Sequence, residues 1–380
     1  MTTLNQSTPR QFRDHTTVRV GGPAGEWILA EDESTAREVL QKHHLPTAAE
    51  RAAGKDSLLV LGGGSNLVVN DKGFPGTVLQ LAFTGISAEP ATNTDDDAVT
   101  VTMAAGHNWD QAVAWTVERG LTGLEALSGI PGAAGATPVQ NVGAYGAEVS
   151  QTLLDIRAWD RAEDELVELS NAELEFGYRD SLLKRETING SPRYVVLSVR
   201  FRLTHRAGQA LSAPVRYAEL ARSLGLDPAA QEEQRRAPLA EVRQKVLQLR
   251  AGKGMVLDAE DHDTWSTGSF FTNPILPASS LPELPEGAPL FPAGTSAEGE
   301  PLVKLSAAWL IDRAGCQKGF GAELTDGRAS LSTKHTLAVT NRGQATAADL
   351  MTVARAAQQK VQERFNVTLH PEPVLVGCNL

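Results

Sequence analysis

The spacing of hydrophobic and polar side chains along this chain predicts a mixture of helices and short strands. Apolar positions three or four residues apart predict helices over 32–44, 108–119, 238–250, 306–314 and 346–365. Short apolar runs predict strands over 57–61, 67–69, 98–104, 153–158, 194–203, 367–369 and 374–376. Capping boxes are expected to begin at Thr35 and at Thr346. The runs at 153–158 and 194–203 are expected to share one sheet.

Two glycine-rich loops interrupt this pattern. The first, GGGSN at 62–66, joins two apolar runs, and the second, at 120–146, carries no charged side chain except Glu125. The first loop is not a Rossmann fingerprint, because Leu67 stands where a glycine belongs, and no lysine follows to make a Walker loop. Alone, it is most simply a tight turn. Together, the two loops predict an extended ligand such as a dinucleotide, and a flavin dinucleotide is the first candidate.

Length and composition narrow the class of protein. A chain of 380 residues exceeds a single core of roughly 250–300 residues, so we expect two or three domains, with a boundary near residue 250. The formal net charge of -11 disfavours a general binder of nucleic acid or anionic membranes. An anionic ligand would therefore need local cations. The prolines concentrated between Pro274 and Pro301 predict an irregular surface segment.

Targeting and metal-binding patterns are missing from the sequence. The first residues lack the apolar stretch of a signal peptide, and no apolar run approaches the ~18 residues of a membrane span. Cys316 and Cys378 are too few for a disulfide framework and fit a reducing compartment. The histidines follow no zinc-binding spacing. We therefore expect a cytoplasmic protein without a metal site.

The segment GSFFTNP at 268–274 presents Ser269 beside two phenylalanines. A hydrolase elbow needs glycine two residues on either side of the serine, but Thr267 and Phe271 stand there. The residues alone leave two interpretations open. Either the segment is a turn with two core phenylalanines, or Ser269 is a proton donor or nucleophile.

The successive motifs of the chain resemble those of the UDP-N-acetylenolpyruvoylglucosamine reductase family. The resemblance runs in order from His15 to Gly377 through HTTVRVGGPA, LGGGSNLVV, GLTGLEALSGIPGAAGATPVQNVGAYGAEV, FGYRDSLLK, GSFFTNP, KLSAAWLIDRAGCQKGFG and HPEPVLVG. It implies an α+β protein with a two-lobed FAD-binding domain of the vanillyl-alcohol-oxidase (PCMH) type and a smaller C-terminal α+β substrate-binding domain. The expected domains are 1–250, in lobes 1–85 and 86–250 with 367–380 as a candidate completion of the first lobe, and 251–366.

The resemblance also implies a reaction. NADPH reduces non-covalent FAD and leaves, and the enolpyruvyl UDP-sugar then takes hydride from the flavin to give UDP-N-acetylmuramate for peptidoglycan. The family's catalytic residues correspond to Arg179, Ser269 and Glu372. A cation suits the substrate carboxylate as negative charge develops beside it, and a hydroxyl can supply the proton. The role of Glu372 comes from the resemblance alone.

Further site residues follow from the same resemblance and from the two loops. Substrate anchoring is expected from Tyr217, Lys253 and Asn273, with Lys253 as a point charge for phosphate. The expected flavin contacts share the two small-residue loops: Gly62, Gly63, Gly64, Ser65, Asn66, Gly129, Ile130, Pro131, Gly132, Gly135, Ala136, Asn141, Gly143, Ala144 and Tyr145. We expect a monomer rather than an oligomer.

Two alternative functions remain open. A flavin oxidase of the same fold would pass electrons to oxygen and often bind its flavin covalently through histidine or cysteine, which both loops lack. A non-catalytic flavin or sugar-nucleotide module would not oxidise NADPH when the enolpyruvyl nucleotide is added.

Overall fold

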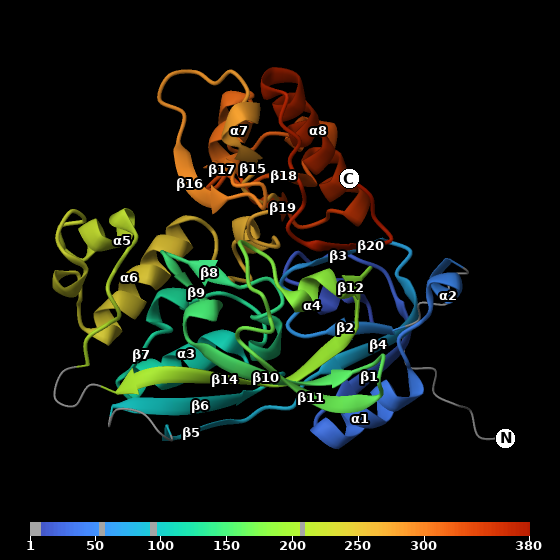
Figure 1. Cartoon of the computed structure of the whole chain (residues 1–380). Coiled ribbons are helices and arrows are strands. Elements are labelled where there is room, and N and C mark those ends of the chain that lie inside the picture. Colours follow the sequence, from blue (N-terminus) through green and yellow to red (C-terminus); the bar gives the residue numbers. More distant parts are fainter. Residues whose placement is uncertain (1–8, 53–57, 92–96, 206–209) are drawn as a thin grey trace. The chain divides into compact units, whose positions relative to one another are not determined.

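The computed structural model describes residues 9–52, 58–91, 97–205 and 210–380. They form two compact units, which are described separately (Figure 1). Unit 1 holds Pro9 and the described residues of Ala24–Gly64 and Pro75–Gly252, and unit 2 holds Arg10–Pro23, Ser65–Phe74 and Lys253–Leu380.

A small sheet near the start of unit 1 carries the first glycine loop. Its order is β1 (Ala24–Ala30), β4 (Phe74–Leu81) and β2 (Leu58–Leu61), with β2 parallel to β4; α1 (Glu33–Lys42) and α2 (Ala48–Ala52) lie between β1 and β2 in the chain. Leu40 of α1 packs in one core with Leu58 and Leu79. The Asp32 carboxylate caps α1 by accepting from Thr35 N at 2.8 Å. The capping box predicted to begin at Thr35 is therefore wrong, because the aspartate before the helix takes that position.

The larger sheet of unit 1 is antiparallel. Its order is β11 (Glu165–Ser170), β10 (Leu153–Asp160), β14 (Tyr194–His205), β6 (Ala98–Ala104) and β5 (Ile86–Pro90), and β7 (Leu121–Thr122) also pairs with β14 (Figure 1). Trp109 of α3 (Trp109–Glu118) is fully buried against this sheet, with its ring 5.8 Å from that of Phe201. Besides short 3-10 helices, unit 1 also contains α4 (Leu182–Arg185), α5 (Ala218–Ser223), α6 (Leu239–Gly252), and the strand pairs β8 (Gly143–Ala144) with β9 (Ala147–Glu148) and β12 (Thr187–Ile188) with β13 (Ser191–Pro192).

Unit 2 gathers segments from three parts of the chain. Strand β3 (Leu67–Val69) pairs in parallel with β20 (Val374–Val376). The other elements are a sheet in the order β15 (Ile275–Pro277), β17 (Pro301–Leu305), β16 (Leu290–Thr295), the pair β18 (Ala329–Leu331) with β19 (Val339–Asn341), and helices α7 (Ala307–Arg313) and α8 (Ala347–Phe365). Buried residues of α8 share one core with Phe270, Phe271 and Val20.

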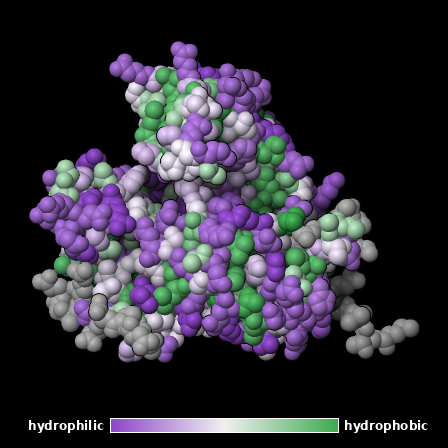
Figure 2. All heavy atoms as spheres, viewed as in Figure 1, coloured by the Kyte–Doolittle hydropathy of each residue, from purple (hydrophilic) through white to green (hydrophobic). Residues whose placement is uncertain are grey.

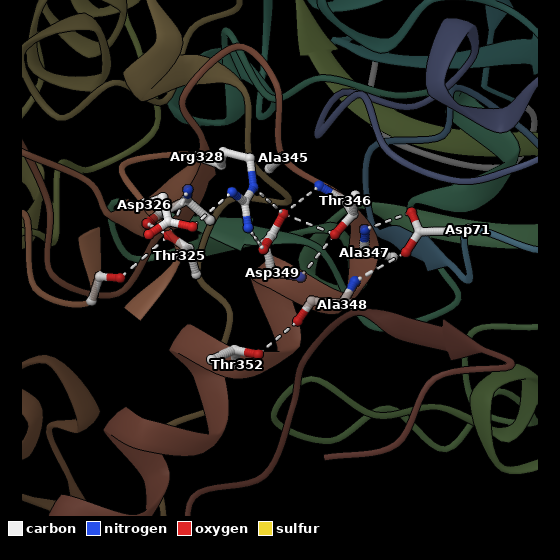
Figure 3. A network of polar contacts seen from close by, with 12 residues as sticks. Asp71, Thr325, Asp326, Arg328, Ala345, Thr346, Ala347, Ala348, Asp349 and Thr352 are labelled. Carbon is white, nitrogen blue, oxygen red and sulfur yellow. Dashed lines mark hydrogen bonds and ion pairs between the residues drawn. The ribbon is translucent and has the colours of Figure 1, made fainter. Parts of the chain in front are cut away.

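A polar network fixes the start of α8 (Figure 3). Thr346 and Asp349 form the predicted capping box. Asp71 accepts from the backbone N–H groups of Ala347 at 2.8 Å and Ala348 at 3.2 Å, while Arg328 makes a two-pronged ion pair with Asp349 at 3.0 and 2.9 Å. The segment around Asp71 is thus tied to a helix that begins more than 270 residues later.

Most predicted elements are confirmed to within a few residues, and Ser57 lies outside the described residues. Besides the capping box at Thr35, one prediction is wrong: residues 367–369 form no strand. The Pro-rich stretch 274–301 is irregular only in part, because it supplies β15 and β16 of a sheet, while 281–289 lies in neither a helix nor a strand. The functional division at residue 250 stays a prediction; the compact units differ from it by placing 10–23, 65–74 and 367–380 in unit 2.

Candidate functional site

The two glycine loops pack directly against each other in unit 1. A Cβ atom on Gly63 would lie 2.6 Å from the Cα atom of Gly132, and one on Gly135 would lie 2.5 Å from the Cβ atom of Ala105. Gly132 also has a φ of +128°, which side-chain-bearing residues rarely adopt. Only glycine allows this close backbone approach. The arrangement fits a dinucleotide that is bound through main-chain amides.

The predicted flavin contacts are divided by the structure. Gly62–Gly64 and all the predicted contacts of the second loop belong to unit 1, whereas Ser65 and Asn66 belong to unit 2. The Asn141 amide is committed to the protein: its Nδ2 donates to Glu148 Oε2 at 3.0 Å and to Gly177 O at 3.1 Å, and its Oδ1 accepts from Ser150 N at 3.0 Å. Asn141 therefore holds the loop in shape, and its contact with a flavin stays a prediction.

Arg179 lies beside the second loop because a tight turn directs it there. Gly177 N donates to Asp180 O at 3.0 Å, and Arg179 has a φ of 53°, in the left-handed region. Its Nη2 donates to Gly143 O at 3.3 Å, and Lys184 Nζ donates to its carbonyl oxygen at 2.8 Å. The structure thus brings the predicted catalytic cation to the predicted flavin loop within unit 1.

The last turn of α6 brings a second arginine, Arg250, close enough to Arg179 for the two charges to interact. Burial lowers the pKa of Arg250 to about 10; the nearby Tyr145 and Asp110 raise it, and the positive charge of Arg179 lowers it further. Burial also raises the pKa of Tyr145 to about 12. The rings of Tyr145 and Tyr217 meet edge to face, with centroids 5.5 Å apart. Tyr217, 44% exposed, is therefore next to the predicted flavin loop.

Asp110 is a structural contributor that the sequence reasoning missed. Its Oδ1 accepts from Gly129 N at 2.6 Å, and both carboxylate oxygens pair with Arg243, at 2.6 and 2.9 Å. Although burial raises the pKa of Asp110, these hydrogen bonds and the arginine charge hold it below its usual value. Asp110 joins α3, α6 and the second glycine loop. A lone aspartate in an amphipathic helix gives no sequence signal for such a role.

In unit 2, backbone pairing places Ser269 and Glu372 on two neighbouring segments of the chain. Glu372 N donates to Phe270 O at 2.8 Å, and Thr272 N donates to His370 O at 3.0 Å, so the two segments run antiparallel. Asn66 Nδ2 donates to Glu372 O at 3.3 Å. Ser269 and Glu372 are both half-buried, while Phe270 is 1% exposed. The phenylalanines are thus core residues, as the first of the two interpretations predicted, while the role of Ser269 as a proton donor or nucleophile stays a prediction.

The three predicted substrate residues do not fall in one unit. Tyr217 belongs to unit 1, and Lys253 and Asn273 belong to unit 2. Asn273 Oδ1 accepts from Ala307 N at 2.9 Å, at the start of α7. The amide of Asn273 therefore helps to cap a helix, and its contact with substrate stays a prediction, as does that of Lys253.

The described part of the chain offers neither a membrane-spanning helix nor a cluster of metal-binding side chains. Within it, no helix combines the length and the apolar character that crossing a bilayer requires. Across the same residues, no group of three or more His, Cys, Asp or Glu side chains is arranged to hold a metal ion.

Comparisons with known proteins agree with this geometry. A family model described as "FAD binding domain" matches residues 45–170, and one described as "UDP-N-acetylenolpyruvoylglucosamine reductase, C-terminal domain" matches residues 260–376. The UDP-N-acetylenolpyruvoylglucosamine reductase of Streptomyces coelicolor is 51% identical over 96% of this chain and 88% of the relative. That of Streptomyces avermitilis is 50% identical over 96% of this chain and 93% of the relative.

A solved structure covers almost the whole chain as well. The crystal structure of UDP-N-acetylenolpyruvylglucosamine reductase from Thermus caldophilus matches with a TM-score of 0.59 and 25% identity, over 97% of this chain and 98% of that one. Together with the packed glycine loops, these matches define an FAD-dependent oxidoreductase and confirm the predicted fold class and cofactor. Within that class, the chain belongs to the UDP-N-acetylenolpyruvoylglucosamine reductase family.

Proposed function

We propose that this protein reduces UDP-N-acetylenolpyruvoylglucosamine to UDP-N-acetylmuramate with electrons from NADPH. Family membership supports the reaction. The structural observation that carries the proposal is the antiparallel pairing that places Ser269 and Glu372 on adjoining segments of unit 2. Arg179 lies in unit 1, so its joint action with these two residues is part of the proposal.

Ser269 is the proton donor in this reaction. FAD, when bound, supplies the hydride that it has taken from NADPH. Hydride addition to the terminal carbon of the enolpyruvyl group breaks the carbon–carbon double bond and leaves negative charge on the carbon beside the carboxylate. The Ser269 Oγ–H then protonates that carbon, and the serine regains a proton from water. The product gains one hydride and one proton.

Arg179 and Glu372 act on the charge that develops. The Arg179 guanidinium pairs with the substrate carboxylate and stabilises the negative charge that spreads onto it. The backbone of Glu372 is held by hydrogen bonds to Phe270 O and from Asn66 Nδ2, which fixes the position from which its side chain extends. We assign Glu372 to orienting the enol form of the substrate. Tyr217, Lys253 and Asn273 bind the sugar nucleotide, with the Lys253 charge on its diphosphate.

The experiment follows NADPH consumption by purified protein, with and without the enolpyruvyl nucleotide. The proposal predicts oxidation that depends on the nucleotide, with a product two hydrogens heavier by mass spectrometry. Oxygen electrodes distinguish a flavin oxidase, which would consume oxygen instead. NADPH that remains unoxidised when the nucleotide is added would show a non-catalytic binding protein.

A further inference from the structure

Glu125 is a buried carboxylate that the proposed chemistry does not use. It lies at the start of a short 3-10 helix, Glu125–Leu127, and is 2% exposed. Its Oε1 accepts from Ala213 N at 2.6 Å and its Oε2 accepts from Gly123 N at 2.7 Å. Burial raises its pKa, which the backbone donors and the charge of Arg236 oppose. No residue in the described ranges forms an ion pair with it.

A carboxylate in this position needs a reason, because burying a charge is unfavourable unless donors compensate. An apolar side chain would fill the same space without that penalty. The difference lies in the two backbone N–H groups that the carboxylate binds. One of them belongs to Ala213, 88 residues further along the chain. Glu125 therefore fastens a distant segment to the second glycine loop.

The fastened part, here called the Tyr217 segment, comprises residues 210–238. Its two ends pair with each other: Ser212 N donates to Ala237 O at 2.8 Å, and Val215 N donates to Arg235 O at 2.7 Å. Thr122 Oγ1 donates to Leu211 O at 2.7 Å beside the Glu125 contact. Glu125 and Thr122 thus hold the base of a closed loop.

Beyond that base, the buried apolar contacts of the Tyr217 segment are made mainly with α6. Its buried side chains form a small core of their own with α6, which includes Leu220, Ala221 and Val246. On the face shown in Figure 2, the region around α5 is largely hydrophilic. The ring of Tyr217 reaches Tyr145 of the second glycine loop at the edge-to-face distance given above. The base therefore helps to position this ring, together with the core on α6 and the contact with Tyr145.

We propose that Glu125 is a positioning residue for sugar-nucleotide binding, which it supports by fixing the Tyr217 segment through Ala213 N and Gly123 N. This inference rests on the proposed function, because it assigns Tyr217 to the nucleotide. Glu125 touches neither substrate nor flavin in this role. It acts through the geometry of the segment that carries Tyr217.

The test compares Glu125→Gln with Glu118→Gln, a matched control on the exposed face of α3. A glutamine fills the same space but accepts through one oxygen only, so one of the two N–H groups loses its acceptor. We expect faster amide hydrogen exchange in peptides covering 211–217 and a KM for the enolpyruvyl nucleotide that rises about tenfold. The rate of flavin reduction by NADPH and the kcat should each stay within about twofold of the wild-type values, because Glu125 touches neither substrate nor flavin. The control should change none of these quantities.

A second variant, Thr122→Val, covers the case in which Glu125→Gln does not fold. It removes the hydroxyl bound to Leu211 O and should change exchange and KM in the same direction by a smaller factor. The inference is overturned by faster exchange with an unchanged KM, or by equal losses in both half-reactions. If the wild type itself does not turn over the nucleotide, the proposed function fails instead, and that result is read before any variant is compared.

Discussion

Replacing Ser269 with alanine separates chemistry from stability. No described residue hydrogen-bonds to the Ser269 hydroxyl, and the segment is held by its backbone, with Phe270 N donating to Leu337 O at 2.7 Å. Alanine keeps that pairing and both buried phenylalanines. The free energy of unfolding should therefore change by less than about 0.5 kcal/mol, as for ordinary surface substitutions.

The chemical cost of the same change is much larger. A positioned proton donor contributes roughly 10²- to 10⁴-fold to a reaction rate. Its loss raises the barrier by roughly 3 to 5 kcal/mol. Because NADPH transfers hydride without any proton from this serine, flavin reduction should proceed at nearly the wild-type rate. Only the half-reaction with the enolpyruvyl nucleotide should slow by that factor.

Anaerobic stopped-flow absorbance of the flavin measures both half-reactions, and thermal unfolding gives the stability. Ser280→Ala is the matched control, since this serine is exposed in the same unit. It should leave both rates unchanged. Equal slowing of the two half-reactions in Ser269→Ala, or a melting temperature several degrees lower, would refute the assignment and indicate a structural serine.

Three further predictions concern stability and the cofactor. The hydrogen bonds from Arg328 lower the pKa of Asp349 to about 2, so this ion pair contributes stability above about pH 4 that is lost as the pH falls through about 2. Asp349→Asn should therefore lower the free energy of unfolding, measured by chemical denaturation, by about 1–2 kcal/mol at pH 7 and by little at pH 2. The range allows for solvent screening at the partly exposed arginine. Acid precipitation should release all the yellow colour into the supernatant, because neither glycine loop contains a histidine or cysteine that could bind flavin covalently. Gly63→Ala should weaken FAD binding by at least about tenfold in fluorescence titrations, because its new methyl group would collide with Gly132. In the control Gly85→Ala, the methyl group would meet nothing closer than 3.9 Å, so this variant should bind FAD normally.

Local signals in the sequence predicted most elements. The strand over 98–104 has a local apolar pattern and the capping box at Thr346 comes from contacts within a few residues, and both are confirmed. Residues 367–369 alternate like a strand, but they follow the left-handed residue Asn366, and Val367 and Leu369 pack into the core without pairing as a strand. Burial alone therefore gave them a strand-like pattern.

Local hydrophobic patterns do not predict which distant segments of the chain pair with each other. The many prolines of 274–301 indicated an irregular segment, yet Pro277 and Pro292 sit in strands of a small sheet where the partner strand β17 follows only later. For the site, the two glycine loops were visible in the sequence, but their backbone contact was not. The supporting roles of Asp110 and Glu125 depend on partners that are 133 and 88 residues away, and single carboxylates carry no local sign of them.

The most direct test of the proposed reaction follows the flavin colour of the purified protein without oxygen. NADPH should bleach the yellow flavin, and one equivalent of UDP-N-acetylenolpyruvoylglucosamine should restore the colour while UDP-N-acetylmuramate appears. A flavin that stays bleached until oxygen is admitted would contradict the account.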